Sequence, residues 1–204
     1  MTAPTRDQLL AAAARLYGEH GYRGTTTRRI AEEAGVNEVT LFRLFGTKTA
    51  LLDEAIREYS QLHTVPLPET PADAERELLI WSSAEHRGLT TCRSMIRKAM
   101  ADMEERGAPE CMAEGPTGAG KMLHGYIDRL ERHGFVPKGQ NGLAASAMLM
   151  GTLFADAMGR DLMPTMYPHP VSKALAAYVQ LFLRSLGYQA VKARRGPIRS
   201  RQAS

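Results

Sequence analysis

Hydrophobic residues recur at helical spacing along almost the whole chain. Between about Asp7 and His20 they fall on one stripe of a helix, and Gly21 follows as a stop signal. The same spacing predicts further helices at about 27–34, 38–44, 48–62, 73–87, 90–105, 117–133, 140–159 and 171–186. Segments rich in Gly and Pro separate them, and no strand-like alternation or internal repeat is present. The pattern therefore predicts an all-α protein of about nine helices.

The most specific local pattern lies between Thr26 and Phe45 and predicts a helix-turn-helix. Thr26 and Asn37 are N-cap residues for two short helices, and Gly35 between them suits a sharp turn. Apolar spacing places seven residues inward: Ile30, Ala31, Ala34, Val36, Leu41, Leu44 and Phe45. The outer side of the second helix is then formed by Glu38, Val39, Thr40, Phe42 and Arg43. This geometry fits a DNA major groove. An ordinary helical hairpin is the alternative, and the outward apolar side chains count against it.

These residues and their flanks resemble the N-terminal domain of the tetracycline-repressor (TetR) family. The matching residues are Gly21-Tyr22, Thr25-Thr26, Ile30-Ala31, Ala34-Gly35-Val36, Thr40-Leu41, Phe45, Lys48 and Leu51-Leu52. The resemblance covers about the first quarter of the chain. It implies a three-helix DNA-binding domain at 1–48 and a larger helical effector-binding and dimerisation domain at 49–187. Two residues depart from the family pattern: Phe42 replaces a Tyr and Leu44 replaces a frequent His, and both changes remove a phosphate donor.

The resemblance implies DNA contacts by Thr26, Thr27, Arg28, Glu38, Val39, Thr40, Phe42, Arg43 and Lys48. The threonines and Lys48 would contact phosphates. Arg28 and Arg43 are candidates for guanine edges, and a phosphate clamp is an equal alternative for Arg43. Glu38 would accept from cytosine, or would only favour the helix N-terminus. Phe42 would pack on a thymine methyl.

The last two predicted helices are apolar around most of their circumference, which indicates burial on two sides. One side would pack on the chain's own core and the other on a second copy, as in the TetR family, which pairs its last two helices. The residues predicted at this dimer interface are Met150, Phe154, Leu175, Tyr178, Val179 and Phe182. Two central helices of a monomeric core are the alternative.

The middle helices are predicted to enclose an effector cavity. Candidate lining residues are Trp81, Met95, Met100, Met103, Met122 and Met148. His86, His124 and Asp156 are candidates for polar contacts with the ligand, and the alternative for each is a surface residue or one satisfied within the fold. Flexible thioethers suit an irregular pocket, although methionine at helical spacing is also ordinary core. The family resemblance implies a small apolar or aromatic effector.

Charge and motifs narrow the function classes. Residues 1–50 carry seven Lys/Arg and five Asp/Glu, whereas residues 187–204 carry five Lys/Arg and no acid, so the basic excess lies in the tail. The tail, 188–204, is expected to be disordered. The segment Gly115–Met122 resembles a phosphate-binding loop but has Met122 where magnesium binding needs a hydroxyl. No catalytic triad, metal-ligand spacing, signal peptide or membrane span is found, so neither cofactor nor metal is expected.

The sequence therefore predicts a cytoplasmic, non-enzymatic, homodimeric repressor. It would bind a palindromic operator in double-stranded DNA and be released by a small effector, with the helix that begins at Lys48 as the lever. A regulator without a small-molecule ligand is the alternative, and a nucleotide-dependent enzyme is the remote one.

Overall fold

Residues 4–61, 65–106 and 118–188 are described by the computed structural model, and every regular element within these ranges is an α-helix. The helices are α1 (Pro4–Gly24), α2 (Thr27–Glu33), α3 (Glu38–Phe45), α4 (Lys48–Gln61), α5 (Ala74–Thr91), α6 (Arg93–Arg106), α8 (Gly118–Arg132), α9 (Gly142–Gly159) and α10 (Val171–Ser185). These nine helices agree with the predicted ones to within four residues at each end. The all-α prediction is confirmed.

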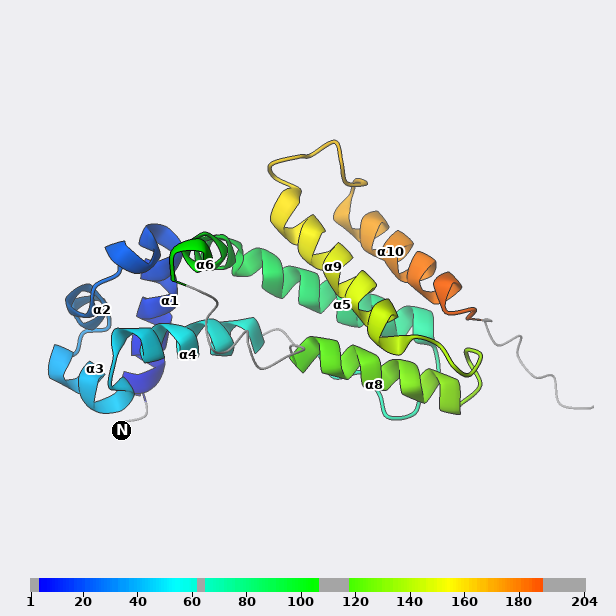
Figure 1. Ribbon diagram of the computed structural model, residues 1–204, viewed down its shortest axis with the longest axis horizontal. Helices are drawn as coiled ribbons and strands as arrows, with labels where there is room; N and C mark the ends of the chain where they lie inside the picture. Colours follow the sequence, from blue (N-terminus) through cyan, green and yellow to red (C-terminus); the bar gives the residue numbers. More distant parts are fainter. Residues whose placement is uncertain (1–3, 62–64, 107–117, 189–204) are drawn as a thin grey trace, which may run out of the picture.

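The helices form two parts along the long axis of the molecule (Figure 1). Helices α1 to α4 lie at one end together with α6, and α5, α8, α9 and α10 lie at the other. Helix α5 continues into α6 across Cys92, so these two consecutive helices connect the two parts. The order of the helices in space therefore differs from their order in the chain.

The first core belongs to the N-terminal part, which we call the head (α1 to α4). It buries Leu9 and Leu16 of α1, Ile30 of α2, Leu41 of α3 and Leu51 of α4. Residues from outside the head complete this core. Cys92, between α5 and α6, and Met95 and Ala99 of α6 are buried in the same cluster. The contact between α1 and α6 is the most extensive between any two helices in the described residues.

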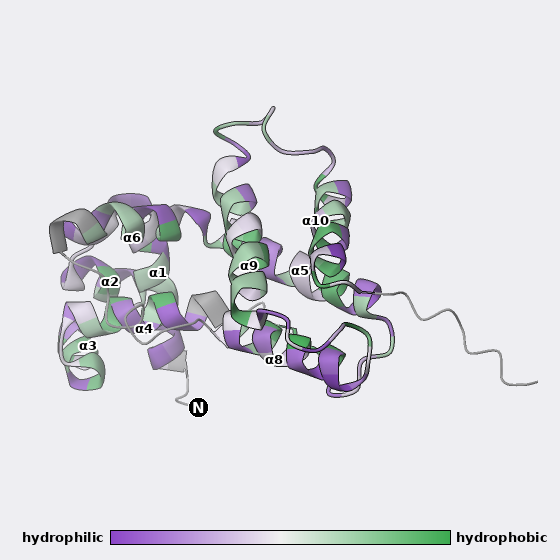
Figure 2. Ribbon diagram, turned by 45° about the vertical axis from the view of Figure 1, so that its right-hand side comes forward, coloured by the Kyte–Doolittle hydropathy of each residue, from purple (hydrophilic) through white to green (hydrophobic). Residues whose placement is uncertain are grey.

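The second core fills the C-terminal part, between α5, α8, α9 and α10. It buries Trp81 of α5, Ile127 of α8, Leu153 of α9 and Phe182 of α10. In Figure 2, α9 and α10 are coloured largely as apolar, whereas much of α8 is polar. This agrees with the predicted apolar character of the last two helices.

Helix α9 is long and apolar enough to span a membrane by composition, with a mean hydropathy of 1.3 over 18 residues. Its polar Asp156 is fully buried, and α9 packs against α5, α8 and α10. These contacts are those of a central helix of the core, which accounts for the apolar character of α9 and for the burial of Asp156 within it.

Two sequence predictions are only partly covered by the described residues. Within the segment that resembles a phosphate-binding loop, residues 115–117 lie outside them, and Gly118 to Met122 form the first turn of α8 with Lys121 exposed. The predicted basic tail lies outside them from residue 189 onward. Tyr188, the first residue of the predicted tail, is described and stacks on Phe135, with ring centroids 6.3 Å apart.

Candidate nucleic-acid interface and C-terminal domain

The turn between α2 and α3 has the geometry that its sequence predicts. The Thr26 hydroxyl accepts from the Arg29 amide at the start of α2. At the end of α2, Val36 N–H donates to the Ala31 carbonyl at 2.9 Å, and Gly35 N–H donates to the Glu32 carbonyl at 3.2 Å. This pair of bonds is a Schellman motif, which requires a left-handed residue, and Gly35 has φ 67°.

Helix α3 begins at once after this turn. The Asn37 side chain accepts from the Val39 amide at 2.8 Å and caps the helix. Leu41 and Phe45 are buried against the head, as predicted. Leu44, also predicted to be buried, is 41% exposed. The prediction was wrong because burial on this two-turn helix follows the row from Leu41 to Phe45, and Leu44 lies outside that row.

The uncovered side of α3 carries several residues of the predicted DNA-binding set. Val39 is 72% exposed and Phe42 is 47% exposed, and Arg43 is exposed beside them. Thr40 and Glu38 are half-buried. Apolar side chains held at the surface of a capped helix are costly to hydrate, and this arrangement suits contact with base methyl groups in a groove.

Helix α2 places the other predicted contacts beside α3. Thr27 donates a hydrogen bond of 2.5 Å to Glu38, which fixes that carboxylate at the N-terminus of α3. Arg28 is exposed and paired with Glu32 one turn later at 2.9 Å. Thr26 is exposed at the start of the helix. The bond to Glu32 uses the Nε of Arg28 and orients its guanidinium along α2.

Lys48 begins α4 and is held by Tyr22, a residue outside the predicted DNA-binding set. Its ammonium donates to the carbonyl of Tyr22 at 2.8 Å and lies 3.7 Å from the centroid of the Tyr22 ring. The Tyr22 hydroxyl is in turn 2.8 Å from the Thr49 hydroxyl. The sequence marked Tyr22 only through the family resemblance, and its contacts with α4 are a tertiary feature.

The residues predicted to line an effector cavity lie in different surroundings. Trp81 is fully buried in the second core, and Met122 packs against that core. Met95 belongs to the first core. Met100 and Met148 are exposed, and Met103 is half-buried on α6. The structure does not bring these six side chains together around one cavity.

The residues predicted at a dimer interface divide in the same way. Leu175, Val179 and Phe182 are buried in the chain's own second core, and Met150 and Tyr178 pack against it. Phe154 is half-buried. The exposed large apolar residues on these two helices are Leu143, Met148 and Leu181, the last 61% exposed.

Two of the predicted polar ligand contacts bind each other. Asp156 accepts from His86 at 2.9 Å, from Tyr178 at 2.8 Å and from Arg160 at 2.8 Å. Burial raises the pKa of the Asp156 carboxyl, but the hydrogen bonds from Arg160, Tyr178 and His86 outweigh it, and the pKa lies below its ordinary value. Burial and the bond to Asp156 raise the pKa of Tyr178 to about 12. This network joins α5, α9 and α10.

His124, the third predicted polar contact, lies apart from this network. Its Nδ1 is buried without a hydrogen-bond partner among the described residues, close to Gly142 at the start of α9.

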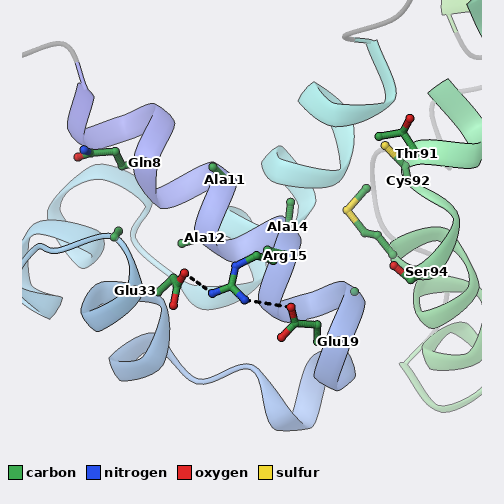
Figure 3. A pocket seen from close by; sticks show the side chains of 13 residues that line it. Gln8, Ala11, Ala12, Ala14, Arg15, Glu19, Glu33, Thr91, Cys92 and Ser94 are labelled. Carbon is green, nitrogen blue, oxygen red and sulfur yellow. Dashed lines mark hydrogen bonds and ion pairs between the residues drawn. The ribbon is translucent and has the colours of Figure 1, made fainter. Parts of the chain in front are cut away.

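A pocket of about 570 Å³ lies between the head and the α5–α6 corner (Figure 3). Its wall on α1 is made of small residues such as Ala11, Ala14 and Gly18, and Met95 lies opposite. Arg15 stands at its edge and pairs with Glu19 of α1 and Glu33 of α2. A second pocket, of about 340 Å³, lies along α5 beside Val65. Neither pocket lies inside the second core.

A helix-turn-helix with an exposed second helix, on an all-helical fold of two parts, defines a DNA-binding transcriptional regulator rather than an enzyme. The family model of the bacterial regulatory proteins, tetR family, matches residues 9–55, from α1 into α4. Residues 9–55 therefore form the N-terminal domain that this family model describes, and α2 and α3 lie within it.

Comparisons with individual proteins agree with this assignment. The chain is 28% identical over 189 residues to the uncharacterized HTH-type transcriptional regulator YvkB of Bacillus subtilis, covering 90% of this chain and 97% of the relative. It is 41% identical to the HTH-type transcriptional repressor KstR2 of Rhodococcus jostii, but over only 54 residues, 26% of each chain.

Solved structures show the same fold over most of the chain. Salmonella enterica GusR superposes with a TM-score of 0.71 and 18% identity, covering 92% of this chain and 97% of that one. The fatty acid degradation regulator FadR of Bacillus halodurans superposes with a TM-score of 0.67 and 20% identity, covering 93% of this chain and all of that one, 100%.

Proposed function

We propose that the protein is a homodimeric, cytoplasmic repressor that binds a palindromic operator and is released from it by a small molecule. The observation that carries the proposal is α3, a capped helix held across α2 with Val39, Phe42 and Arg43 on its uncovered side. Several relatives that match the head are named repressors, which supports repression over activation.

The exposed apolar surface of α9 and α10 supports the homodimer. Leu143, Met148 and Leu181 lie on these helices, and their exposure leaves apolar area that a second copy would bury. A two-fold pairing would place two copies of α3 on one side of the dimer. Such pairs read half-sites spaced about 34–36 Å apart along DNA.

Unpaired polar atoms in the C-terminal part support a bound effector. Trp81 Nε1 and Ser82 Oγ of α5 and Ser146 Oγ of α9 are buried without a hydrogen-bond partner among the described residues. Buried polar groups without partners are rare, and a ligand or water would satisfy them. An effector would favour a conformer whose heads are wrongly spaced, with α4 moving Lys48.

A regulator without a small-molecule effector is the second candidate. The two pockets described above favour it, because neither lies inside the second core. The chain has a single tryptophan, Trp81, and it is fully buried in that core. Its fluorescence is therefore a direct probe: a saturable change with aromatic or aliphatic compounds, together with a lower operator affinity, supports the effector. Binding that leaves operator affinity unchanged refutes effector release.

In-vitro selection of random duplex DNA tests the DNA-binding part. Wild type, Arg43→Ala and the control Arg132→Ala, an exposed arginine on α8, would be compared. We expect a palindrome for all three, with relaxed preference at one position per half-site for Arg43→Ala only. An unchanged preference would move Arg43 to the phosphates. No enriched sequence at low salt would refute sequence-specific binding.

A further inference from the structure

A chain of contacts leads from α6 to the residue that begins α4. Asp102 of α6 accepts from the Tyr17 hydroxyl at 2.8 Å and from the Tyr22 backbone amide at 3.1 Å. The carbonyl of the same Tyr22 accepts from Lys48, and the Tyr22 ring lies under the Lys48 ammonium. Tyr22 is therefore held by α6 on one side and itself holds Lys48 on the other.

The break in α1 explains why Tyr22 needs this tether. Gly21 has φ 66° and ψ −174°, so the regular helix ends there and the backbone turns before Tyr22. A residue that follows such a break is no longer fixed by the helical hydrogen-bond pattern. The carboxylate of Asp102 supplies an acceptor for its amide, 80 residues further along the chain.

The other end of α6 is attached to the C-terminal part. Arg93 pairs with Asp161 at 3.0 Å, and Arg97 donates to the same carboxylate at 3.1 Å and to the Met158 carbonyl. Asp161 follows Arg160, the C-cap residue of α9. Helix α6 thus has one end bonded to the end of α9 and carries Asp102, bonded to the head, further along.

We propose that Asp102 is a positioning residue for DNA binding: it fixes Tyr22, and Tyr22 holds Lys48 where its ammonium meets a DNA phosphate. The proposal rests on the proposed phosphate contact of Lys48. Asp102 itself would touch no DNA, since its carboxylate is directed from α6 toward Tyr17 of α1.

A double-mutant cycle tests the proposal. Operator affinity would be measured by fluorescence anisotropy for wild type, Asp102→Asn, Lys48→Ala and the double variant, with Asp128→Asn as control. Asp128 is exposed on α8, so its substitution changes the net charge equally without touching the head. We expect each of Asp102→Asn and Lys48→Ala to raise Kd about tenfold, the effect of one charge-assisted bond. The double variant should bind like Lys48→Ala alone.

The salt dependence gives a readout that a purely structural role would not change. Loss of one phosphate contact lowers the slope of log K against log salt by about one, so Asp102→Asn should share the lower slope of Lys48→Ala. Additive losses, or an unchanged slope for Asp102→Asn, would overturn the proposal. An unchanged affinity for Lys48→Ala would instead refute the phosphate contact.

A second variant keeps the test valid if Asp102→Asn does not fold. Tyr22→Leu retains the backbone amide and carbonyl but removes the ring under Lys48 and the bond to Thr49. We expect it to weaken operator binding in the wild-type background and to have no further effect beside Lys48→Ala. Equal losses in both backgrounds would overturn the proposal.

Discussion

The buried network around Asp156 leads to a stability prediction for Asp156→Asn. The Asp156 side chain is fully buried, and that of Arg160 is 11% exposed. Removing one charge from a buried pair costs about 3–5 kcal/mol, because the other charge stays in the interior without compensation. Arg160 keeps a bond to the Pro168 carbonyl and a contact with the Tyr167 ring. We therefore expect the lower end of this range, about 3 kcal/mol.

Urea denaturation followed by circular dichroism measures this loss. With a slope of about 2 kcal/mol per M, a loss of about 3 kcal/mol lowers the midpoint by about 1.5 M. All variants must be compared at one protein concentration, since unfolding of a dimer depends on concentration. Asp128→Asn, an exposed acid, is the control and should leave the midpoint unchanged.

Two further variants separate charge from hydrogen bonding. Tyr178→Phe removes one donor to Asp156 and should cost about 1 kcal/mol. Asp156→Leu combined with Arg160→Met removes both charges and should recover part of the loss. If Asp156→Asn shifts the midpoint no more than Asp128→Asn does, the network does not stabilise the fold and the reasoning is refuted.

Three other predictions concern Asp156, Gly35 and Leu181. The pKa of Asp156 is lowered in the folded state, so the contribution of this carboxylate to the free energy of unfolding is complete above about pH 4, the pKa of the unfolded chain, and is lost as pH falls through the lower folded pKa. Wild type should therefore lose more stability than Asp156→Asn between pH 5 and pH 3, and equal losses would contradict the sign of the pKa shift. In Gly35→Ala the added methyl group meets no atom within 4 Å, but the alanine must adopt φ 67°. We therefore expect the free energy of unfolding to fall by about 1–2 kcal/mol in a thermal melt, and an unchanged melting temperature would show that the turn tolerates a side chain. Leu181→Glu should give monomers in light scattering, whereas Ile80→Glu, an equally apolar exposed site on α5, should not; a Leu181→Glu dimer would place the interface elsewhere.

The local structure of the head was predictable because its determinants are close together in the chain. Caps at Thr26 and Asn37, and a glycine that reaches positive φ at position 35, act within one or two helical turns. Apolar spacing located each helix to within a few residues for the same reason. The family resemblance added the expected DNA contacts, which spacing alone does not identify.

The candidate effector and dimer residues were less predictable, because helical spacing does not say which partner covers an apolar face. Met95 and Met122 occupy similar positions on amphipathic helices, yet one is buried in the first core and the other packs on the second. Leu44 was expected inside and is exposed, since the head packs against the side of α3 that carries Leu41 and Phe45. Only the packing of whole helices decides these outcomes.

The helices, the turn before α3 and the class of protein could be inferred from the sequence, since these depend on residues a few positions apart. The completion of the first core by α6, the contact of Asp102 with Tyr22 and the bond between Asp156 and His86 became visible in the folded chain alone. The partners in the two hydrogen-bonded pairs are separated by 80 and 70 residues. Such pairs form only when distant helices have packed, because the burial of apolar area, which is non-directional, sets which polar groups meet.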